Sequence, residues 1–195
     1  MEKVMTTIAL DKEGNLASDS KGSLGNTAVQ HHFTKIRVLD GFELRGERCL
    51  AVAYAGNSSQ CDYLIPWLKD GANPLKYMPM VLGGIQAIIL TDKGSKFYAV
   101  GTISDGWDNM AIGSGGTYAR TAMDLGKTAI DAVRQSIKED NCSGGKIRYV
   151  NRAALVAALD NPKAKNLMGE IDDEAKEPEV ESLNPKAPAS SAWGN

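Results

Sequence analysis

The chain has 195 residues, enough for one sizeable core and for one domain with a tail. Its formal net charge of −2 gives no reason to expect a nucleic-acid or membrane partner. The cysteines Cys49, Cys61 and Cys142 lack metal-like spacing and are typical of reduced thiols in the cytosol. No apolar run approaches the ~20 residues that span a bilayer, and the first residues lack a signal-peptide core, so we expect a cytoplasmic protein.

The first half of the chain predicts strands followed by one helix. The expected strands are Thr6–Leu10, Leu16–Ser18, Thr34–Leu39 and Cys49–Tyr54. The first two flank a polar turn and should form a β-hairpin. Asn57 or Ser58 can cap a helix that runs towards Leu68, and Pro66 should kink or shorten that helix.

The second half alternates strands and helices after a connector at 71–84 that carries weak signals. The expected strands are Ile85–Thr91, Lys96–Thr102, Met110–Ile112 and Ile147–Val150. Apolar residues at helical spacing from Tyr118 to Ile137 predict one long amphipathic helix, and a short helix is expected at Arg152–Leu159. This order of elements indicates sheets packed on each other with helices outside.

Composition divides the chain into three parts. Residues 1–5 are expected to be a short leader or a mis-assigned start, and residues 6–160 the folded domain. Residues 161–195 are acidic, contain prolines and are poor in aromatic residues. Such a segment can bury little apolar surface, so we predict a disordered tail.

Thr6 and Thr7 open the first apolar run. If the residues before it are removed, Thr6 carries a hydroxyl and a free α-amine on one residue. The amine can then act as the base that activates the hydroxyl, because its ordinary pKa of about 7.7–8.0 leaves much of it neutral near pH 7. Taken alone, however, two threonines at the head of a strand simply reflect the β propensity of this residue.

Other motifs are weak when each is taken alone. An acid such as Asp19 before a glycine-rich loop is usually a turn residue, and a strand lysine such as Lys35 usually faces solvent. Gly56 can serve backbone conformation alone. The run 113–116, Gly-Ser-Gly-Gly, lacks the lysine of a phosphate-binding loop. His31–His32 is better explained as a surface loop than as a metal site.

In order, these motifs resemble those of the proteasome-type threonine peptidases, above all the bacterial HslV peptidases. The matching pieces are Thr6-Thr7-Ile8, Ser18-Asp19-Ser20, Ser23-Leu24-Gly25-Asn26-Thr27, Lys35-Ile36-Arg37, Ala53-Tyr54-Ala55-Gly56, Ala111–Ala119 and Asp140–Gly145. The resemblance extends from Thr6 to Leu159. It implies an α+β fold, the four-layer αββα sandwich of two antiparallel sheets flanked by helices that N-terminal nucleophile (Ntn) hydrolases share.

The resemblance also implies roles for single residues. Thr6 is similar to the nucleophile, Lys35 to the active-site lysine whose charge lowers the pKa of nearby groups, and Asp19 to the carboxylate that holds this lysine. Ser114, Asp140 and Ser143 are similar to the polar network around the threonine amine.

Substrate contacts follow from the same comparison. The backbone N–H of Gly56 would stabilise the oxyanion, and Tyr54 would help line the specificity pocket. The backbone around Ser23 would pair with an extended substrate. The activity implied is that of a threonine endopeptidase working inside an oligomeric chamber and fed by a separate ATPase, with no cofactor and no metal.

Two departures from the family pattern leave alternatives open. Met5 stands where self-cleaving members usually carry glycine, so Thr6 is exposed only if residues 1–5 are removed or if Met5 is the true start. The connector 71–84 replaces a long second helix that contributes to contacts between subunits. A catalytically silent assembly or partner-binding protein with Thr6 masked is therefore the alternative, followed by an Ntn amidohydrolase acting on a small amide.

Overall fold

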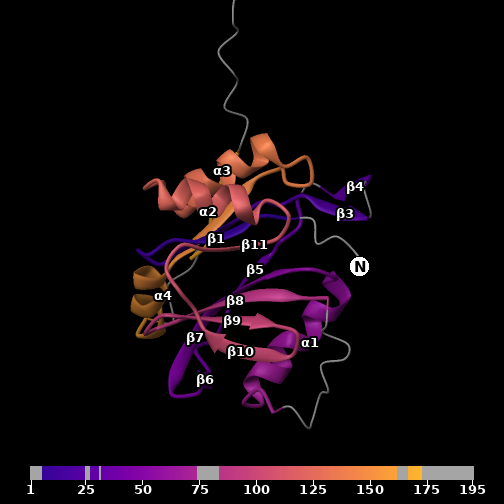
Figure 1. Ribbon diagram of the computed structural model, residues 1–195. Coiled ribbons are helices and arrows are strands. Elements are labelled where there is room, and N and C mark those ends of the chain that lie inside the picture. Colours follow the sequence, from indigo (N-terminus) through magenta and orange to yellow (C-terminus); the bar gives the residue numbers. More distant parts are fainter. Residues whose placement is uncertain (1–5, 25–26, 31, 74–83, 162–166, 173–195) are drawn as a thin grey trace, which may run out of the picture.

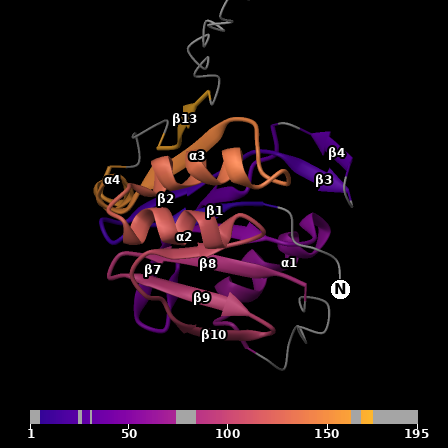
Figure 2. The same ribbon diagram turned by 45° about the horizontal axis from the view of Figure 1, so that its top comes forward.

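Two antiparallel sheets lie face to face, and helices cover their outer faces (Figures 1 and 2). The structure is a computed structural model that describes residues 6–24, 27–30, 32–73, 84–161 and 167–172. Its layers are those of the αββα sandwich, so the predicted fold class is confirmed.

The first sheet has the strand order β11-β1-β2-β12-β13. Its strands are β1 (Ile8–Leu10), β2 (Asn15–Ser18), β11 (Met110–Ile112), β12 (Ile147–Asn151) and β13 (Gly169–Ile171). The predicted hairpin pairs Ile8 with Ser18 and Leu10 with Leu16. The carboxylate of Asp11 holds its turn by accepting the backbone N–H groups of Glu13 and Asn15.

The second sheet has the order β10-β9-β8-β7-β5, with β6 also paired to β7. Its strands are β5 (Ile36–Val38), β6 (Glu43–Leu44), β7 (Glu47–Ala55), β8 (Gln86–Thr91), β9 (Ser95–Ala99) and β10 (Thr102–Asp105). The prediction of one strand at 96–102 was wrong at its end. Val100 adopts a left-handed φ of 49°, which turns the chain back so that Thr102 begins β10. A separate pair, β3 (Gly22–Leu24) and β4 (Thr27–Gln30), lies beside the sandwich.

Four helices complete the layers among the described residues. They are α1 (Ser58–Lys69), α2 (Gly116–Asp124), α3 (Ala129–Glu139) and α4 (Arg152–Leu159). Small side chains of the first sheet, such as Ala9 and Ala17, pack against α2 and α3. Trp67 of α1 packs edge-on against Tyr98 of the second sheet. The core between the sheets is aliphatic, with Ile8, Leu16, Ile36, Leu50 and Ile88 fully buried or nearly so.

The prediction of a single helix from Tyr118 to Ile137 was wrong. α2 ends at Asp124, and α3 begins anew at Ala129 after the N-cap Thr128, whose hydroxyl accepts the N–H of Asp131. The Asp11 carboxylate also accepts the N–H of Ala129 at 2.9 Å. Hydrophobic spacing continues across this break, so periodicity alone does not reveal it.

The end of α1 at Lys69 agrees with the predicted end near Leu68, and Pro66 does not shorten the helix. One further boundary differs from expectation. Residues 169–171, assigned to the tail, form β13 and pair with β12, placing Ile171 opposite Ile147. The rest of the predicted tail from 173, most of the connector (74–83) and the predicted leader (1–5) lie outside the described residues.

Candidate active site

Thr6 lies two residues before the start of β1, a strand of the first sheet. Its hydroxyl donates a hydrogen bond to Asp19 Oδ1 at 2.8 Å. Its backbone nitrogen donates to Ser114 Oγ at 3.1 Å. The residue is 2% exposed. The hydroxyl and the nitrogen of Thr6 therefore contact two different polar groups, both of which were predicted from the sequence motifs.

Asp19 and Lys35 form a buried ion pair beside the Thr6 hydroxyl. Lys35 Nζ lies 2.6 Å from Asp19 Oδ1, the same oxygen that accepts from Thr6. Asp19 follows β2 of the first sheet and Lys35 precedes β5 of the second. The pair therefore joins the two sheets and brings a cation close to the Thr6 hydroxyl.

Burial dominates the electrostatics of Lys35. It lowers the pKa of the ammonium group below its usual value near 10.5, and attraction by Asp19 opposes this effect only in part. Asp140 acts in the same direction as Asp19, and Lys21 in the opposite one.

A second polar cluster surrounds the Thr6 nitrogen. Ser114 lies in the loop between β11 and α2, while Asp140 and Ser143 follow α3. Asp140 Oδ2 accepts the hydroxyl of Ser114 at 2.6 Å and that of Ser143 at 2.8 Å. The N–H of Cys142 donates to the other carboxylate oxygen at 3.1 Å. The structure therefore brings Thr6, Asp19, Lys35, Ser114, Asp140 and Ser143 into one connected group.

The predicted substrate contacts do not join this group. Gly56 follows β7 with φ at +134°, and a Cβ there would lie 2.3 Å from the carbonyl oxygen of Gly84. Backbone packing therefore already requires glycine at this position. Tyr54 is buried in the core beneath α1, and its hydroxyl donates to the carbonyl of Thr34 at 3.5 Å. Ser23 lies in β3, which pairs with β4. The roles of these three residues stay predictions.

Sequence reasoning did not assign a role to Thr7 or Gly144. Thr7 places its N–H 2.9 Å from Asp19 Oδ1 and its hydroxyl 2.7 Å from Ser143 Oγ. The N–H of Gly144 donates to Asp19 Oδ2 at 3.0 Å. The doubled threonine was the available signal for Thr7, since neighbouring residues of an extended chain point to opposite sides.

This arrangement can do chemistry only if the Thr6 nitrogen is free. In a peptide bond with Met5, the lone pair of this nitrogen is delocalised into the carbonyl group and does not accept a proton. Among the described residues, the hydroxyl then has Asp19 as its hydrogen-bond acceptor. The carboxylate of Asp19 already accepts hydrogen bonds from Lys35 Nζ and from the N–H groups of Thr7 and Gly144, so it is poorly placed to act as a base. A free amine at the same place would lie beside its own hydroxyl and could take the proton.

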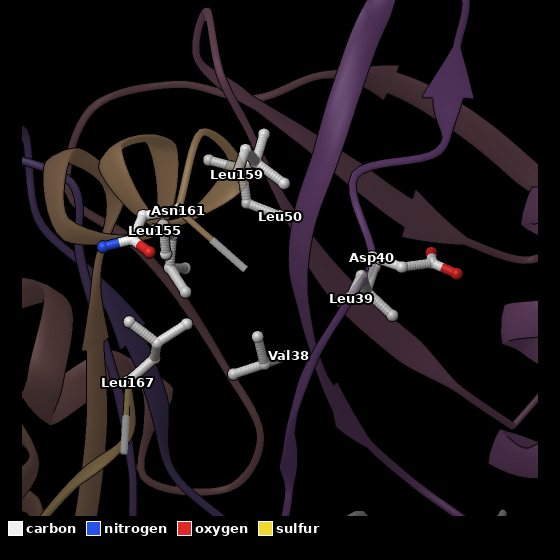
Figure 3. A pocket seen from close by; sticks show the side chains of 9 residues that line it. Val38, Leu39, Asp40, Leu50, Leu155, Leu159, Asn161 and Leu167 are labelled. Atoms are coloured by element: carbon white, nitrogen blue, oxygen red, sulfur yellow. The ribbon is translucent and has the colours of Figure 1, made fainter. Parts of the chain in front are cut away.

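A pocket of ≈ 330 Å³ lies elsewhere, against α4 (Figure 3). Its wall contains apolar side chains such as Val38, Leu50 and Leu159, and the polar residues Asp40 and Asn161 also line it. No residue that bonds to Thr6 lines it. A small-amide hydrolase would need an enclosed pocket beside the nucleophile. This pocket therefore gives that alternative no support.

Within the described ranges, no three His, Cys, Asp or Glu side chains are grouped so that they could hold a metal ion. His32 is exposed. The same part of the chain contains no helix long and apolar enough to cross a membrane.

No protein-family model matches the chain, and no curated protein matches it. Solved structures do share its fold. Eukaryotic HslV from Trypanosoma brucei aligns with a TM-score of 0.59 and 17% identity, over 75% of this chain and 99% of that one. BPH from Thiobacillus denitrificans aligns with a TM-score of 0.54 and 16% identity, over 74% and 95%. BPH in complex with epoxomicin gives 0.53 and 17%, over 74% and 96%. The chain therefore has the HslV-like fold that its motifs predicted.

Proposed function

We propose that this chain is a threonine-type endopeptidase whose nucleophile is Thr6, exposed when the residues before it are removed. One observation carries the proposal. The hydroxyl of Thr6 donates a hydrogen bond to Asp19, which is ion-paired with the buried Lys35. The Thr6 nitrogen donates to Ser114, whose hydroxyl in turn donates to Asp140. A strand that needed β propensity alone would have no physical use for two buried polar clusters around one threonine, because each buried polar group costs free energy unless it is paired.

The reaction proceeds by acyl transfer in two steps. The free Thr6 amine takes the hydroxyl proton as the oxygen attacks the peptide carbonyl, and the protonated amine then delivers that proton to the leaving nitrogen. The remaining ester on Thr6 is attacked by water, which the same amine deprotonates. The cation of Lys35 stabilises the negative charge that develops on the threonine oxygen, and the Gly56 N–H stabilises the carbonyl oxygen.

The proposal extends to the substrate and to the assembly. An extended peptide would pair with the backbone around Ser23, which lies in β3. The resemblance of the motifs to those of HslV-type peptidases supports a homo-oligomeric ring whose chamber is fed by a separate ATPase, with unfolded protein as substrate.

A silent assembly protein is the second candidate, and one observation favours it. Thr6 is 2% exposed in the chain that carries Met1–Met5, and its nitrogen is a peptide nitrogen there. If residues 1–5 stay in place, the base is missing and the same sandwich serves assembly alone.

Matched proteins distinguish the two candidates. One begins at Thr6, and the other retains residues 1–5; both are assayed with fluorogenic peptides and with an unfolded protein. The peptidase proposal expects hydrolysis by the first protein only. Equal inactivity of both, with the fold intact by circular dichroism, would favour the silent candidate.

A further inference from the structure

Thr7 is a buried threonine whose polar atoms contact both halves of the candidate site. It is 0% exposed, and its N–H donates to Asp19 Oδ1 at 2.9 Å. Its hydroxyl lies 2.7 Å from Ser143 Oγ, the one hydrogen-bond partner that this hydroxyl has among the described residues. A buried hydroxyl that donates to no acceptor costs free energy, so we assign Thr7 as the donor in its hydrogen bond with Ser143.

The direction of the hydrogen bonds follows from counting protons. An ionised carboxylate only accepts, so Ser143 donates its single proton to Asp140 Oδ2 at 2.8 Å. Ser143 Oγ must then accept from Thr7. The protons therefore run from Thr7 through Ser143 to Asp140.

Asp140 Oδ2 is also connected to the nitrogen of Thr6 by hydrogen bonds. Asp140 Oδ2 also accepts the Ser114 hydroxyl at 2.6 Å, and Ser114 Oγ accepts the N–H of Thr6 at 3.1 Å. Thr7 is therefore connected to the nitrogen of its own neighbour through three side chains from outside the β1 strand.

Gly115 provides the space that this arrangement needs. A Cβ at Gly115 would lie 1.9 Å from Thr7 Oγ1. The N–H of Gly115 also donates to the carbonyl of Thr6 at 3.2 Å. The glycine after Ser114 thus admits the Thr7 hydroxyl and fixes the backbone that carries both threonines.

We propose that Thr7 is a positioning residue that sets the proton affinity of the Thr6 amine through Ser143, Asp140 and Ser114. The inference rests on the proposed function, since only a free amine has a proton affinity to set. Donation by Thr7 strengthens the Ser143 hydrogen bond and draws negative charge from Asp140, because hydrogen bonds in a chain polarise one another. Without it, Asp140 attracts the protonated amine more strongly through Ser114, and the amine needs a higher pH to become a base.

Other ionisable groups lie close enough to contribute. Asp19 and Lys35 lie on the hydroxyl side of Thr6, and Lys21 donates to the carbonyl of Asn141 at 2.6 Å. Cys142 lies in the same turn as Asp140. All four stay unchanged in the variants below, so a shift between variants reports the hydroxyl of Thr7.

The test compares Thr7→Val with Thr7→Ser in chains that begin at Thr6. Valine keeps the shape and removes the hydroxyl, while serine restores it. For Thr7→Val we expect roughly a tenfold loss in kcat, an unchanged KM and an acid limb of kcat/KM moved upward by about half a pH unit. Thr7→Ser should return both to near wild-type values.

Thr91→Val is the matched control. Thr91 is also 0% exposed, and its hydroxyl donates to a carboxylate, Glu47 Oε2, at 2.6 Å in the second sheet. Its loss should lower stability without moving the pH profile. Identical profiles for the Thr7 and Thr91 variants, or failure of Thr7→Ser to restore activity, would overturn the inference.

The rate of acetylation of the Thr6 amine, measured by mass spectrometry as a function of pH, reports the proton affinity of this amine and does not require peptidase activity. We expect the amine of Thr7→Val to titrate at a higher pH than that of the wild type. If the wild-type chain cleaves no peptide, the proposed function fails, and this titration alone decides the role of Thr7. An unchanged titration contradicts the role.

Discussion

Lys35 and Asp19 form an ion pair of 2.6 Å whose side chains are only 5% and 0% exposed. The two residues come from different sheets and meet at the hydroxyl of Thr6. Removing two charges from water is costly, and the cost is recovered only with good geometry and further hydrogen bonds. Asp19 meets this condition, because the N–H groups of Thr7 and Gly144 also donate to it.

Replacing Lys35 with methionine should abolish most activity and also destabilise the fold. We expect a loss of at least about 10²-fold in kcat, since the cation beside the reacting oxygen is gone. A loss of about 3–5 kcal/mol in the free energy of unfolding is expected because Asp19 is left unpaired. Peptide assays and urea titrations measure the two effects.

Lys96→Met is the control for that variant. Lys96 is 7% exposed and pairs with Glu47 and Asp105, away from Thr6. It should lose stability and keep its kcat. If Lys35→Met kept near wild-type activity, Lys35 would have only a structural role.

The lowered pKa of Lys35 predicts a pH dependence of stability. The unfolded chain holds this proton up to about pH 10.5, whereas the folded chain releases it earlier, so unfolding binds a proton in between. The free energy of unfolding of the wild type, relative to Lys35→Met, should therefore rise with pH up to about 10.5.

Urea titrations from pH 7 to pH 10 measure this difference. For Lys96 the pKa shift has the opposite direction, because hydrogen bonds to Glu47 and Asp105 raise the pKa of its ammonium group. The contribution of Lys96 to the free energy of unfolding is fully present below about pH 10.5. The difference in this free energy between the wild type and Lys96→Met should therefore not change with pH in that range. A flat or falling line for Lys35 would contradict the assignment of a desolvated ammonium group.

Thr6→Ala should remove peptide hydrolysis entirely while the fold persists. The variant loses one hydrogen bond to Asp19, a cost of about 1 kcal/mol in the free energy of unfolding. Thr6→Ser, which keeps both a hydroxyl and an amine, should retain activity. An unchanged rate in Thr6→Ala would reject Thr6 as the nucleophile.

Cys49 should resist thiol reagents in the folded protein. Burial raises the pKa of its thiol to about 11, so almost no reactive thiolate exists at pH 8. Half-buried Cys142 provides the comparison within the same chain. Iodoacetamide labelling and peptide mapping should find Cys49 unmodified until urea unfolds the protein; rapid labelling without urea would contradict its position in the core.

Gly56→Ala should destabilise the fold whether or not Gly56 takes part in catalysis. The added Cβ would meet the Gly84 carbonyl at 2.3 Å, and φ of +134° is unfavourable for alanine. We expect a cost of about 1–3 kcal/mol. Gly46→Ala separates the two causes, because Gly46 has φ of +81° but open space around it. Equal losses in the free energy of unfolding for Gly56→Ala and Gly46→Ala would show that the backbone at Gly84 moves away from the new Cβ at little cost.

The predicted members of the site could be identified because each lies in a short motif at an element boundary. Asp19 directly follows a strand, Lys35 directly precedes one, and Ser114 lies in a glycine-rich loop between strand and helix. The order of these motifs resembles that of the HslV-type peptidases, and this resemblance predicted which residues lie together. Thr7 escaped notice because its hydroxyl depends on Ser143, whose position relative to β1 only the folded chain sets.

The missed boundaries have a related cause. The break between α2 and α3 depends on Asp11, whose carboxylate accepts the N–H of Ala129 from across the fold. β13 depends on its pairing with β12 and on the contacts of Lys146 and Arg148 with Glu170. Such long-range contacts override local composition, which indicated only a helix continuation and an acidic tail.

The intact mass of the purified protein, before and after incubation with epoxomicin, tests the central claim most directly. A peptide epoxyketone offers two electrophilic carbons, so a residue with both a hydroxyl and a free amine can react at both. The account predicts a mass that begins at Thr6 and a gain of one inhibitor per chain, lost in Thr6→Ala. A chain that begins at Thr6 and gains no inhibitor, or one that retains residues 1–5 throughout, would contradict it.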